Sequence, residues 1–397
     1  MTKIMKAFRF LRTVAVCALL IFTASYGASA RKWVSTWATA QQVVEPHNNP
    51  PIPLAGETLR QIVQVSIPGK EIRLRLSNRF SQDDLEIIRV EIAQARTEGS
   101  SPDIYPKTAK TLTFKGNESV TLKAGEEIYC DPLRFKLKER MNVAITITYG
   151  RAPANIITGH PGSRTTSYFM GKEARTDHWY TIESIDVKAP RKAASIAVLG
   201  DSITDGRGTT TNGQDRWTDN LSRRLLKDKR TKNLSVLNLG LGGNCVIGPG
   251  GNGPVARSRY DHDLLEMQGV KYIILFEGVN DLGTTRDGMA TAQELISVFT
   301  EITQKAHAKG IKVIGATVMP FKHNRYYTED HEKGRQYFND WIRTGGVVDG
   351  LIDFDAAMSG KDEPDALNPK YLFENDWLHP NAQGYKAMGD YIDLNLF

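Results

Sequence analysis

The sequence predicts an α/β protein of two domains, a jelly-roll-like antiparallel β-sandwich followed by a three-layer α/β/α domain with a parallel sheet. Two observations predict it. Apolar residues recur with period two up to about residue 190, and beyond it short apolar runs alternate with amphipathic helices. The 397 residues, 40% hydrophobic and 24% charged, are typical of a globular protein and exclude disordered and collagen-like classes. We predict domains at residues 31–190 and 191–397.

Residues 1–30 are expected to be a secretory signal peptide. Basic side chains precede an apolar run over residues 13–23, and Ala28-Ser29-Ala30 forms a small-residue cleavage pattern. A membrane anchor is the weaker interpretation because the run is too short to span a bilayer comfortably, and no membrane span is expected elsewhere. Lipidation at Cys17 is disfavoured because the bulky Val16 precedes it. We expect cleavage near Ala30 and a secreted or periplasmic location.

The charge balance depends on residues 1–30. The whole chain has 51 basic and 45 acidic side chains, a net charge of +6. Four basic and no acidic side chains lie in residues 1–30, so 47 and 45 remain, a net charge of +2. So small an excess gives no reason to expect a nucleic acid as a partner.

The first predicted domain consists of half-buried strands. Apolar and polar residues alternate over residues 72–77, 133–138 and 143–149. Turn pairs such as Pro68-Gly69 separate these runs. The alternation predicts one buried and one exposed face for each strand, as in an antiparallel sandwich.

Strands and helices alternate in the second predicted domain. We expect strands at residues 195–199, 236–239, 272–276, 311–318 and 350–354, and helices at residues 217–227, 292–308, 337–343 and 382–396. This order predicts a parallel sheet with helices on both faces. Because ligands bind beyond the carboxyl ends of such strands, the loops that follow them are expected to carry the chemistry.

The loop after the first of these strands contains a candidate nucleophile, Ser202. A serine at a strand-to-helix turn exposes its hydroxyl beside backbone N–H groups, which can stabilise an anion. Taken alone, serine and aspartate at such a turn are more typical of helix caps. Asp201 and Asp205 are therefore interpreted as braces of the turn.

A loop near the C-terminus contains a candidate acid–base pair, Asp376 and His379. A serine nucleophile needs a base, and the base needs a carboxylate that fixes its tautomer. A structural turn is the plain alternative. A metal site is weaker, because no dense cluster of ligating side chains accompanies the pair. We expect neither a metal nor a cofactor.

Two further loops offer donors for an oxyanion. Gly243, after the second strand, lets a backbone N–H approach a substrate oxygen closely, and Gly242 is the alternative residue. Asn280, after the third strand, offers a side-chain amide. The plain alternative is that this glycine and this asparagine are ordinary turn residues. Asp281 is interpreted as structural.

Together these loops resemble the motifs of the SGNH or GDSL-type hydrolase superfamily. The matching residues are Gly200-Asp201-Ser202, Gly243, Gly278-x-Asn280-Asp281 and Asp376-x-x-His379. Ile203 stands where many members have leucine. The resemblance covers about residues 193–397 and implies a flavodoxin-like fold and ester hydrolysis.

The resemblance also implies a role for each residue. Ser202 would be the nucleophile, His379 its base and Asp376 the carboxylate that orients the base. The backbone N–H groups of Ser202 and Gly243, with the Asn280 side chain, would form the oxyanion hole.

Segments of the first domain extend the resemblance to secreted bacterial members described as acetylxylan-esterase-like. The similar segments are residues 33–38, 59–63, 74–78, 158–161 and 166–168. They imply an acetylated plant polysaccharide such as xylan as the substrate. A lipase or general carboxylesterase stays open as an alternative, as does a non-catalytic glycan-binding protein with a decayed site. The polar, Gly-rich loops favour the first interpretation.

Four further side chains are candidates for contacting the substrate. Trp377 lies between the two residues of the acid–base pair, and His160, Arg164 and Tyr168 lie in a polar stretch before the second domain. Simple packing is the alternative for Trp377. After cleavage two cysteines remain, Cys130 and Cys245, which we expect to be unpaired thiols.

Overall fold

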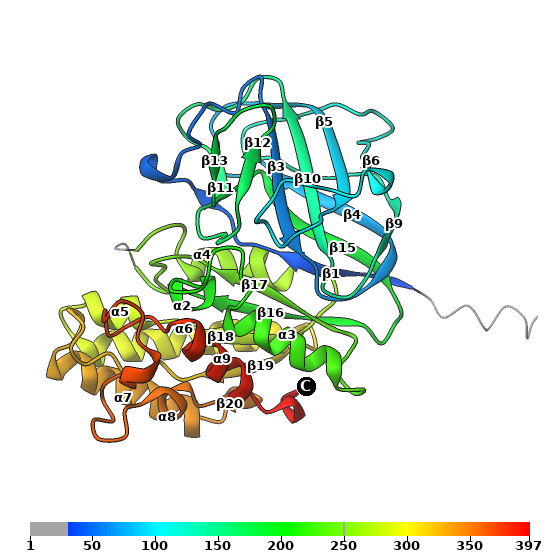
Figure 1. Cartoon of the computed structure of the whole chain (residues 1–397). Helices are drawn as coiled ribbons and strands as arrows, with labels where there is room; N and C mark the ends of the chain where they lie inside the picture. Colours follow the sequence, from blue (N-terminus) through cyan, green and yellow to red (C-terminus); the bar gives the residue numbers. More distant parts are fainter. Residues whose placement is uncertain (1–30, 249–250) are drawn as a thin grey trace, which may run out of the picture.

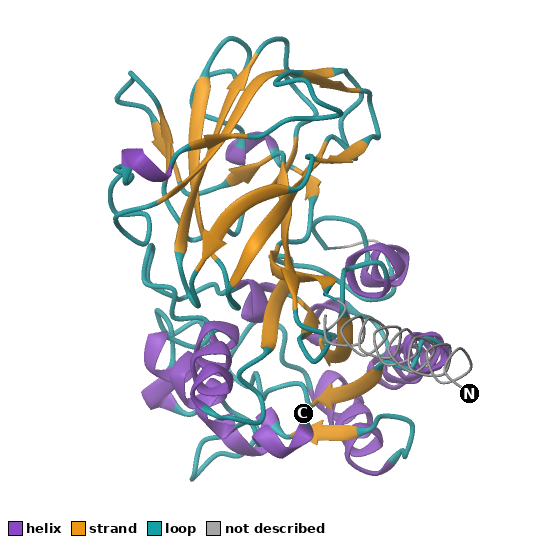
Figure 2. Cartoon of the chain, turned by 90° about the vertical axis from the view of Figure 1, so that its right-hand side faces the viewer, coloured by secondary structure: helices purple, strands orange, loops and turns teal. Residues whose placement is uncertain are grey.

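The computed structural model describes residues 31–248 and 251–397, so the expected signal peptide and Cys17 lie outside the described residues (Figure 1). Figure 2 separates the chain by secondary structure, with the strands of the N-terminal region above and most helices below, around a second sheet. The predicted fold class, a parallel α/β sheet preceded by an antiparallel region, is confirmed. Within the described ranges, no helix has both the length and the apolar character needed to cross a bilayer.

Three antiparallel sheets form the N-terminal region. The first has the order β1-β15-β4-β8 with β9 beside β4, the second β13-β12-β3-β10-β5-β6 with β7 beside β5, and the third β14-β11-β2. The strands are β1 (Lys32–Ala38), β2 (Gln42–Val43), β3 (Thr58–Gln64), β4 (Gly69–Ser77), β5 (Leu85–Gln94), β6 (Lys110–Thr111), β7 (Val120–Leu122), β8 (Glu127–Tyr129), β9 (Leu133–Leu137), β10 (Asn142–Tyr149), β11 (Thr158–His160), β12 (Ser167–Phe169), β13 (Arg175–Thr176), β14 (Trp179–Tyr180) and β15 (Ile182–Ala189).

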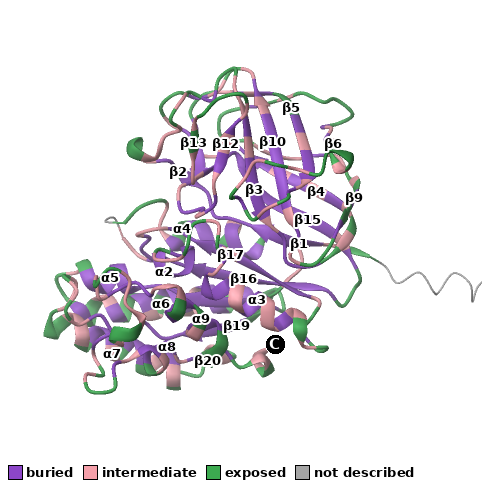
Figure 3. Ribbon diagram, viewed as in Figure 1, coloured by how far each residue is buried: buried purple, intermediate pink, exposed green. Residues whose placement is uncertain are grey.

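The apolar faces of the first two sheets share one core. Its fully buried members include Val63, Leu74, Ile145 and Ile185. The predicted alternation holds for β4, but β10 is buried on nearly all of its length (Figure 3). Ala144, on the other face of β10, packs with Ala95 because the segment after β5 covers that face.

The second region is built on one parallel sheet with the order β17-β16-β18-β19-β20. Its strands are β16 (Ala194–Gly200), β17 (Leu234–Gly240), β18 (Val270–Phe276), β19 (Lys312–Ala316) and β20 (Gly350–Ile352). The chain crosses from β16 to β17 in one direction and from β18 to β19 in the other. Because such crossovers are right-handed, the connecting helices lie on opposite faces, and the order reverses between β16 and β18.

All four predicted helices form, three of them with shifted ends, and the structure adds five shorter helices. They are α2 (Ser202–Asp205), α3 (Trp217–Lys227), α4 (Ala256–Tyr260), a π-helix at Asp261–Leu265, α5 (Val279–Thr284), α6 (Gly288–Ala308), α7 (Glu329–Thr344), α8 (Phe354–Met358) and α9 (Ala382–Tyr391). Short 3-10 turns lie at Pro46–Asn48, Pro106–Thr108, Pro369–Tyr371 and Leu394–Leu396. α3 has its predicted bounds because Trp217, Leu221 and Leu225 are four residues apart and all buried.

Caps explain the ends that the sequence pattern misplaced. α6 begins four residues early because Asp287 accepts a hydrogen bond from the Ala290 N–H at 2.9 Å. The first turns of α7 consist mainly of polar residues, so the apolar pattern did not predict them. Thr328 caps this helix. α9 ends at Tyr391, short of the prediction, where Arg224 donates to the Ile392 carbonyl at 2.6 Å.

The two regions meet along β1, which lies beside β17 (Figure 1). The Ser35 carbonyl accepts hydrogen bonds from the hydroxyls of Ser195 at 3.0 Å and Ser235 at 2.5 Å. The Ser35 N–H donates to the Gln268 carbonyl at 2.9 Å. These buried bonds tie the N-terminal region to the parallel sheet.

Candidate active site

Ser202 begins α2 directly beyond the carboxyl end of β16. Asp201 caps this short helix, because its carboxylate accepts a hydrogen bond from the Ile203 N–H at 2.9 Å. Burial raises the pKa of Asp201 to about 7. The strand and the cap together hold the Ser202 hydroxyl at the edge of the sheet where strand order reverses.

Three side chains form a continuous hydrogen-bonded chain. Ser202 Oγ lies 2.8 Å from His379 Nε2, and His379 Nδ1 lies 2.6 Å from Asp376 Oδ2. Because a carboxylate can only accept, Nδ1 carries the proton and Nε2 is left to accept from the serine. The same carboxylate accepts from the backbone N–H groups of Leu378 at 2.9 Å and His379 at 2.8 Å. The local turn therefore fixes the pair that the sequence spacing indicated.

The electrostatics of the pair suit a neutral base beside an ionised carboxylate. Burial lowers the pKa of His379, against the hydrogen bond and charge of Asp376, which raise it. Burial acts to raise the pKa of Asp376, but hydrogen bonds from the His379 ring and backbone lower it below its ordinary value. His379 is therefore unprotonated near neutral pH and able to accept a proton.

Donors for an oxyanion converge on the same place. The described residues provide no hydrogen-bond acceptor for the backbone N–H of Ser202 or Gly243. Gly243 has a φ of +70°, a conformation that favours glycine. Asn280 Nδ2 donates one proton to the Asn244 carbonyl at 2.8 Å, and its Oδ1 accepts from the Tyr326 hydroxyl at 3.0 Å. One amide proton of Asn280 stays available.

Asp281 and Arg259 support these donors from behind. The Asp281 carboxylate accepts from the backbone N–H groups of Val246 at 2.9 Å and Ile247 at 3.0 Å, which holds the loop after β17. The guanidinium of Arg259, buried beneath that loop, donates to Asn244 Oδ1 at 3.0 Å. Sequence reasoning missed Arg259, because no local pattern marks a buried arginine.

A cavity of about 720 Å³ opens over this chain of residues. It is lined by all five residues of the expected catalytic set: Ser202, Gly243, Asn280, Asp376 and His379. His160 and Arg164 also line it, together with residues that the sequence did not indicate, such as Arg207, Asn252, Asn324 and Arg325.

Two of the expected substrate contacts lie elsewhere. Trp377 is not among the residues that line the cavity, because its φ of +57° accompanies a turn that packs the indole on His323, with ring centroids 4.6 Å apart. Tyr168 is also outside the lining, because its hydroxyl donates to the Gly99 carbonyl at 2.7 Å within the N-terminal region. Both expectations are corrected to packing roles.

His160 links the N-terminal region to the helix that begins at Ser202. Its Nδ1 lies 2.9 Å from the Ala40 carbonyl and its Nε2 lies 3.0 Å from Asp205 Oδ1, with both side chains buried. A carbonyl only accepts, so Nδ1 donates to it, and one further proton bridges Nε2 and the carboxylate. A Cβ on Gly162 would lie 1.8 Å from Asp205 Oδ2, so only glycine fits there. Asp205 thus has a structural partner, as its interpretation as a brace implied.

The described residues contain one group with the geometry of a metal site: Glu127, Glu183 and His262. It lies between the two regions and outside the cavity that Ser202 lines. The Arg75 guanidinium already lies within it, with Nε 3.1 Å from a Glu183 oxygen, so the group fits an ion-pair network better than a cation site.

Both cysteines of the described chain are buried and unpaired. Burial raises the pKa of Cys130 to about 11 and of Cys245 to about 12, so neither thiol is activated as a nucleophile.

Comparison with known proteins adds a family. Residues 198–387 match the GDSL-like lipase/acylhydrolase family. No curated protein matches the chain.

Solved structures resemble about half of the chain. One is a member of the lipolytic protein G-D-S-L family from Veillonella parvula, with 19% identity, covering 50% of this chain and 96% of that one at a TM-score of 0.38. A second is a GDSL-like lipase from Bacteroides thetaiotaomicron, with 20% identity, 51% and 87% coverage and a TM-score of 0.37. A third is the acetyl xylan esterase AlAXEase, with 20% identity, 50% and 96% coverage and a TM-score of 0.38.

Proposed function

We propose that this chain is a serine esterase that removes acetyl groups from polysaccharide such as xylan. Residues 198–387 match the GDSL-like lipase/acylhydrolase family, in agreement with a carboxylic ester hydrolase. The observation that carries the proposal is the hydrogen-bonded chain from Ser202 through His379 to Asp376, at the floor of a polar cavity.

The proposed reaction begins with attack of Ser202 Oγ on the ester carbonyl carbon, while the hydroxyl proton passes to His379 Nε2. Asp376 stabilises the imidazolium that forms, through the 2.6 Å hydrogen bond to Nδ1. The carbonyl oxygen becomes an oxyanion, which accepts hydrogen bonds from the N–H groups of Ser202 and Gly243 and from Asn280 Nδ2.

Collapse of the tetrahedral intermediate breaks the bond to the alcohol oxygen, which takes the proton from His379 and leaves. An acetyl group is then bonded to Ser202 Oγ. His379 next accepts a proton from water as that water attacks the acetyl carbon. A second collapse releases acetic acid and returns the proton to Ser202 Oγ.

The character of the cavity supports a sugar ester with a short acyl group over a lipid. Most lining side chains are polar or are glycine, and the apolar exceptions are Pro161, Leu241 and Leu378. A long acyl chain needs a continuous apolar surface, whereas sugar hydroxyls bind amides, imidazoles and guanidiniums.

The proposal extends to location. The basic and apolar pattern of residues 3–30 supports export, so we place the enzyme in the periplasm or outside the cell. An acetylated polysaccharide would be accessible there.

The test compares acetylated xylan with 4-nitrophenyl esters of two to twelve carbons, with Ser202→Ala as the control. Acetate release from xylan, together with aryl-ester rates that fall steeply beyond short acyl chains, is the expected result. A preference for long acyl chains with no acetate from xylan would favour a lipase, and hydrolysis of no ester at all would favour a glycan-binding protein.

A further inference from the structure

Three arginines that line the catalytic cavity have no anionic partner. Arg164, Arg207 and Arg325 contribute to its wall, and no carboxylate of the described residues forms an ion pair with any of them. Buried arginines elsewhere behave differently: Arg259 is paired with Asp263 at 2.9 Å, as is typical when guanidinium groups leave water. Arginine is charged at every physiological pH, and none of these three charges is in direct contact with a carboxylate of the described residues.

The carboxylates in the cavity have other partners. Asp376 is engaged by His379, and Asp205 is engaged by His160. Glu45 accepts from Gln42 Nε2 at 2.6 Å and from Asn48 Nδ2 at 3.1 Å. The three arginines are therefore free to bind an anion that enters from solvent.

Arg164 is the most constrained of the three. It has a φ of +50°, a left-handed conformation that is uncommon for residues other than glycine. Its Nε is buried and has no hydrogen-bond partner within the described residues. A buried N–H of this kind needs an acceptor, and the Arg164 side chain borders the cavity, where a ligand could provide one.

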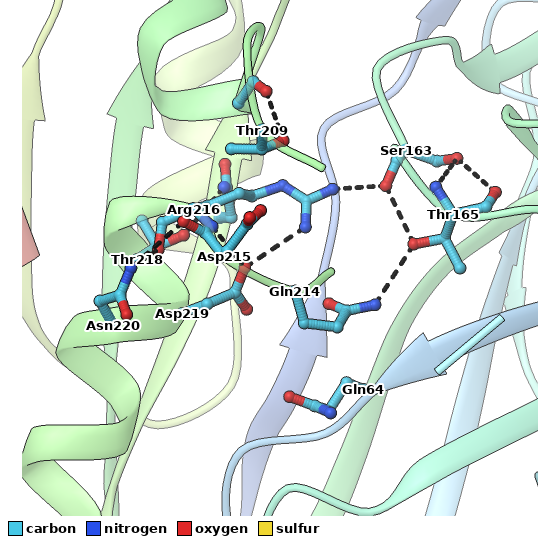
Figure 4. Close-up of polar contacts among 12 residues, drawn as sticks. Gln64, Ser163, Thr165, Thr209, Gln214, Asp215, Arg216, Thr218, Asp219 and Asn220 are labelled. Atoms are coloured by element: carbon cyan, nitrogen blue, oxygen red, sulfur yellow. Dashed lines mark hydrogen bonds and ion pairs between the residues drawn. The ribbon is translucent and has the colours of Figure 1, made fainter. Parts of the chain in front are cut away.

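Side chains of the catalytic region hold Ser163 and Thr165, the two residues that flank Arg164 (Figure 4). The Arg216 guanidinium donates to the Ser163 carbonyl, and Gln214 Nε2 donates to Thr165 Oγ1 at 3.3 Å. The Asn212 N–H also donates to the Arg164 carbonyl at 2.8 Å. Strain that is held by contacts on both sides of a residue, at the edge of a cavity, points to a function for that residue.

We propose that the sugar ester bound by this enzyme carries a carboxylate, as in an acetylated polysaccharide with uronic acid residues, and that Arg164, Arg207 and Arg325 bind that carboxylate. The inference rests on the proposed function and adds the charge of the substrate to it. Guanidinium groups bind carboxylates through two parallel hydrogen bonds, which gives both affinity and orientation. The N-terminal region, through Arg164, thereby takes part in choosing the substrate.

The charges of Arg164 and Arg207 also act on His379, the proposed base. Arg164 and Arg207 both contribute to the lowered pKa of His379, after the larger effect of burial. Arg164, Arg207 and His379 all line the same cavity, so a ligand whose carboxylate meets the arginines would be held on the side of the site where the ester reacts.

The test measures binding to the inactive Ser202→Ala protein by calorimetry. The ligands are a xylo-oligosaccharide with one glucuronic acid branch and the same compound after reduction of its carboxyl group to an alcohol. We expect the acid to bind at least tenfold more tightly at low salt, and the difference to shrink as salt is added.

Single substitutions then test which of the three arginines produce the preference for the acid. Arg207→Gln and Arg325→Gln change exposed side chains and should leave the fold intact, and each should lower the ratio of acid to alcohol affinity, as should Arg164→Gln. Arg191→Gln, at an exposed arginine that does not line the cavity, is the matched control and should leave the ratio unchanged.

Each outcome decides the inference. Equal binding of the two ligands, no binding of the acid, or a preference that survives the triple variant Arg164→Gln/Arg207→Gln/Arg325→Gln would overturn it. Failure of the proposed function is distinguishable, because it would appear as no acetate release from acetylated glycans by the unmodified enzyme, even if the acid binds preferentially.

Discussion

Replacing Asp376 by asparagine should impair the enzyme far more than its small change in shape suggests. In the structure Oδ1 accepts two backbone N–H groups, from Leu378 at 2.9 Å and His379 at 2.8 Å, and Oδ2 accepts from His379 Nδ1 at 2.6 Å. An asparagine would keep its oxygen on the two backbone donors, because its NH₂ group cannot accept from them. The NH₂ group would then face Nδ1.

That arrangement selects the wrong tautomer of His379. Nδ1 would have to accept from the amide, so the ring proton would move to Nε2, which could no longer take the proton of Ser202. Loss of one charge-assisted hydrogen bond removes about 1.5–3 kcal/mol, and restoring the reactive tautomer against the amide costs about as much again. The sum, about 3–6 kcal/mol, corresponds to a fall in kcat of about 10²- to 10⁴-fold.

The assay is the hydrolysis of 4-nitrophenyl acetate at pH 7, with thermal unfolding to show that the variant is folded. Asp362→Asn is the matched control, because that aspartate is exposed and does not line the cavity, and its rate should be unchanged. A loss smaller than tenfold in folded Asp376→Asn would refute the reasoning.

Three further predictions follow from the same geometry. Asn280→Ala removes one oxyanion donor and should lower kcat for 4-nitrophenyl acetate about 10²- to 10³-fold, and a loss below tenfold would exclude that role. Because burial lowers the pKa of His379, kcat/KM should fall on acidification with a midpoint below about 6.5, and a pH–rate midpoint above that value would contradict it. Burial opposes protonation of His262, but hydrogen bonds to Asp263 and Glu127 raise its pKa to about 9. The stability that it contributes is therefore full below about pH 6.5 and lost as the pH rises through 9. His262→Ala should reduce the free energy of unfolding by about 2 kcal/mol in urea titrations at pH 6 and by less at pH 10, and an equal reduction at both would be inconsistent with this linkage.

Sequence patterns predicted the elements whose buried residues recur at a regular spacing along the chain. The bounds of α3 follow from apolar residues four apart, and the buried face of β4 follows from alternation at Ile72, Leu74 and Leu76. The two-sided burial of β10 could not be predicted, because it depends on a distant segment that covers the sheet. Helix ends moved wherever a side-chain cap, such as Asp287, outweighed the apolar pattern.

The residues of the candidate site likewise fall into two groups, those that the sequence indicated and those that it could not indicate. The sequence indicated Asp376 and His379, because a single loop brings them together, and it indicated Ser202 because a serine after a buried strand is exposed at the sheet edge. It could not indicate the pairing of His160 with Asp205 or the support from Arg259, because these contacts join segments that meet only in the folded chain. Trp377 was misplaced because adjacency to catalytic residues in sequence does not fix the direction of a side chain in a turn with positive φ.

The most direct test of the serine-esterase mechanism is covalent labelling with diethyl 4-nitrophenyl phosphate, followed by mass spectrometry of the whole chain and of its peptides. Attack by an activated serine releases 4-nitrophenol and leaves one diethylphosphoryl group on the enzyme. We predict one such group per chain, located on Ser202, with esterase activity lost in proportion to labelling and no label on Ser202→Ala. Labelling at another residue that abolishes activity, or esterase activity that persists in Ser202→Ala, would contradict the mechanism.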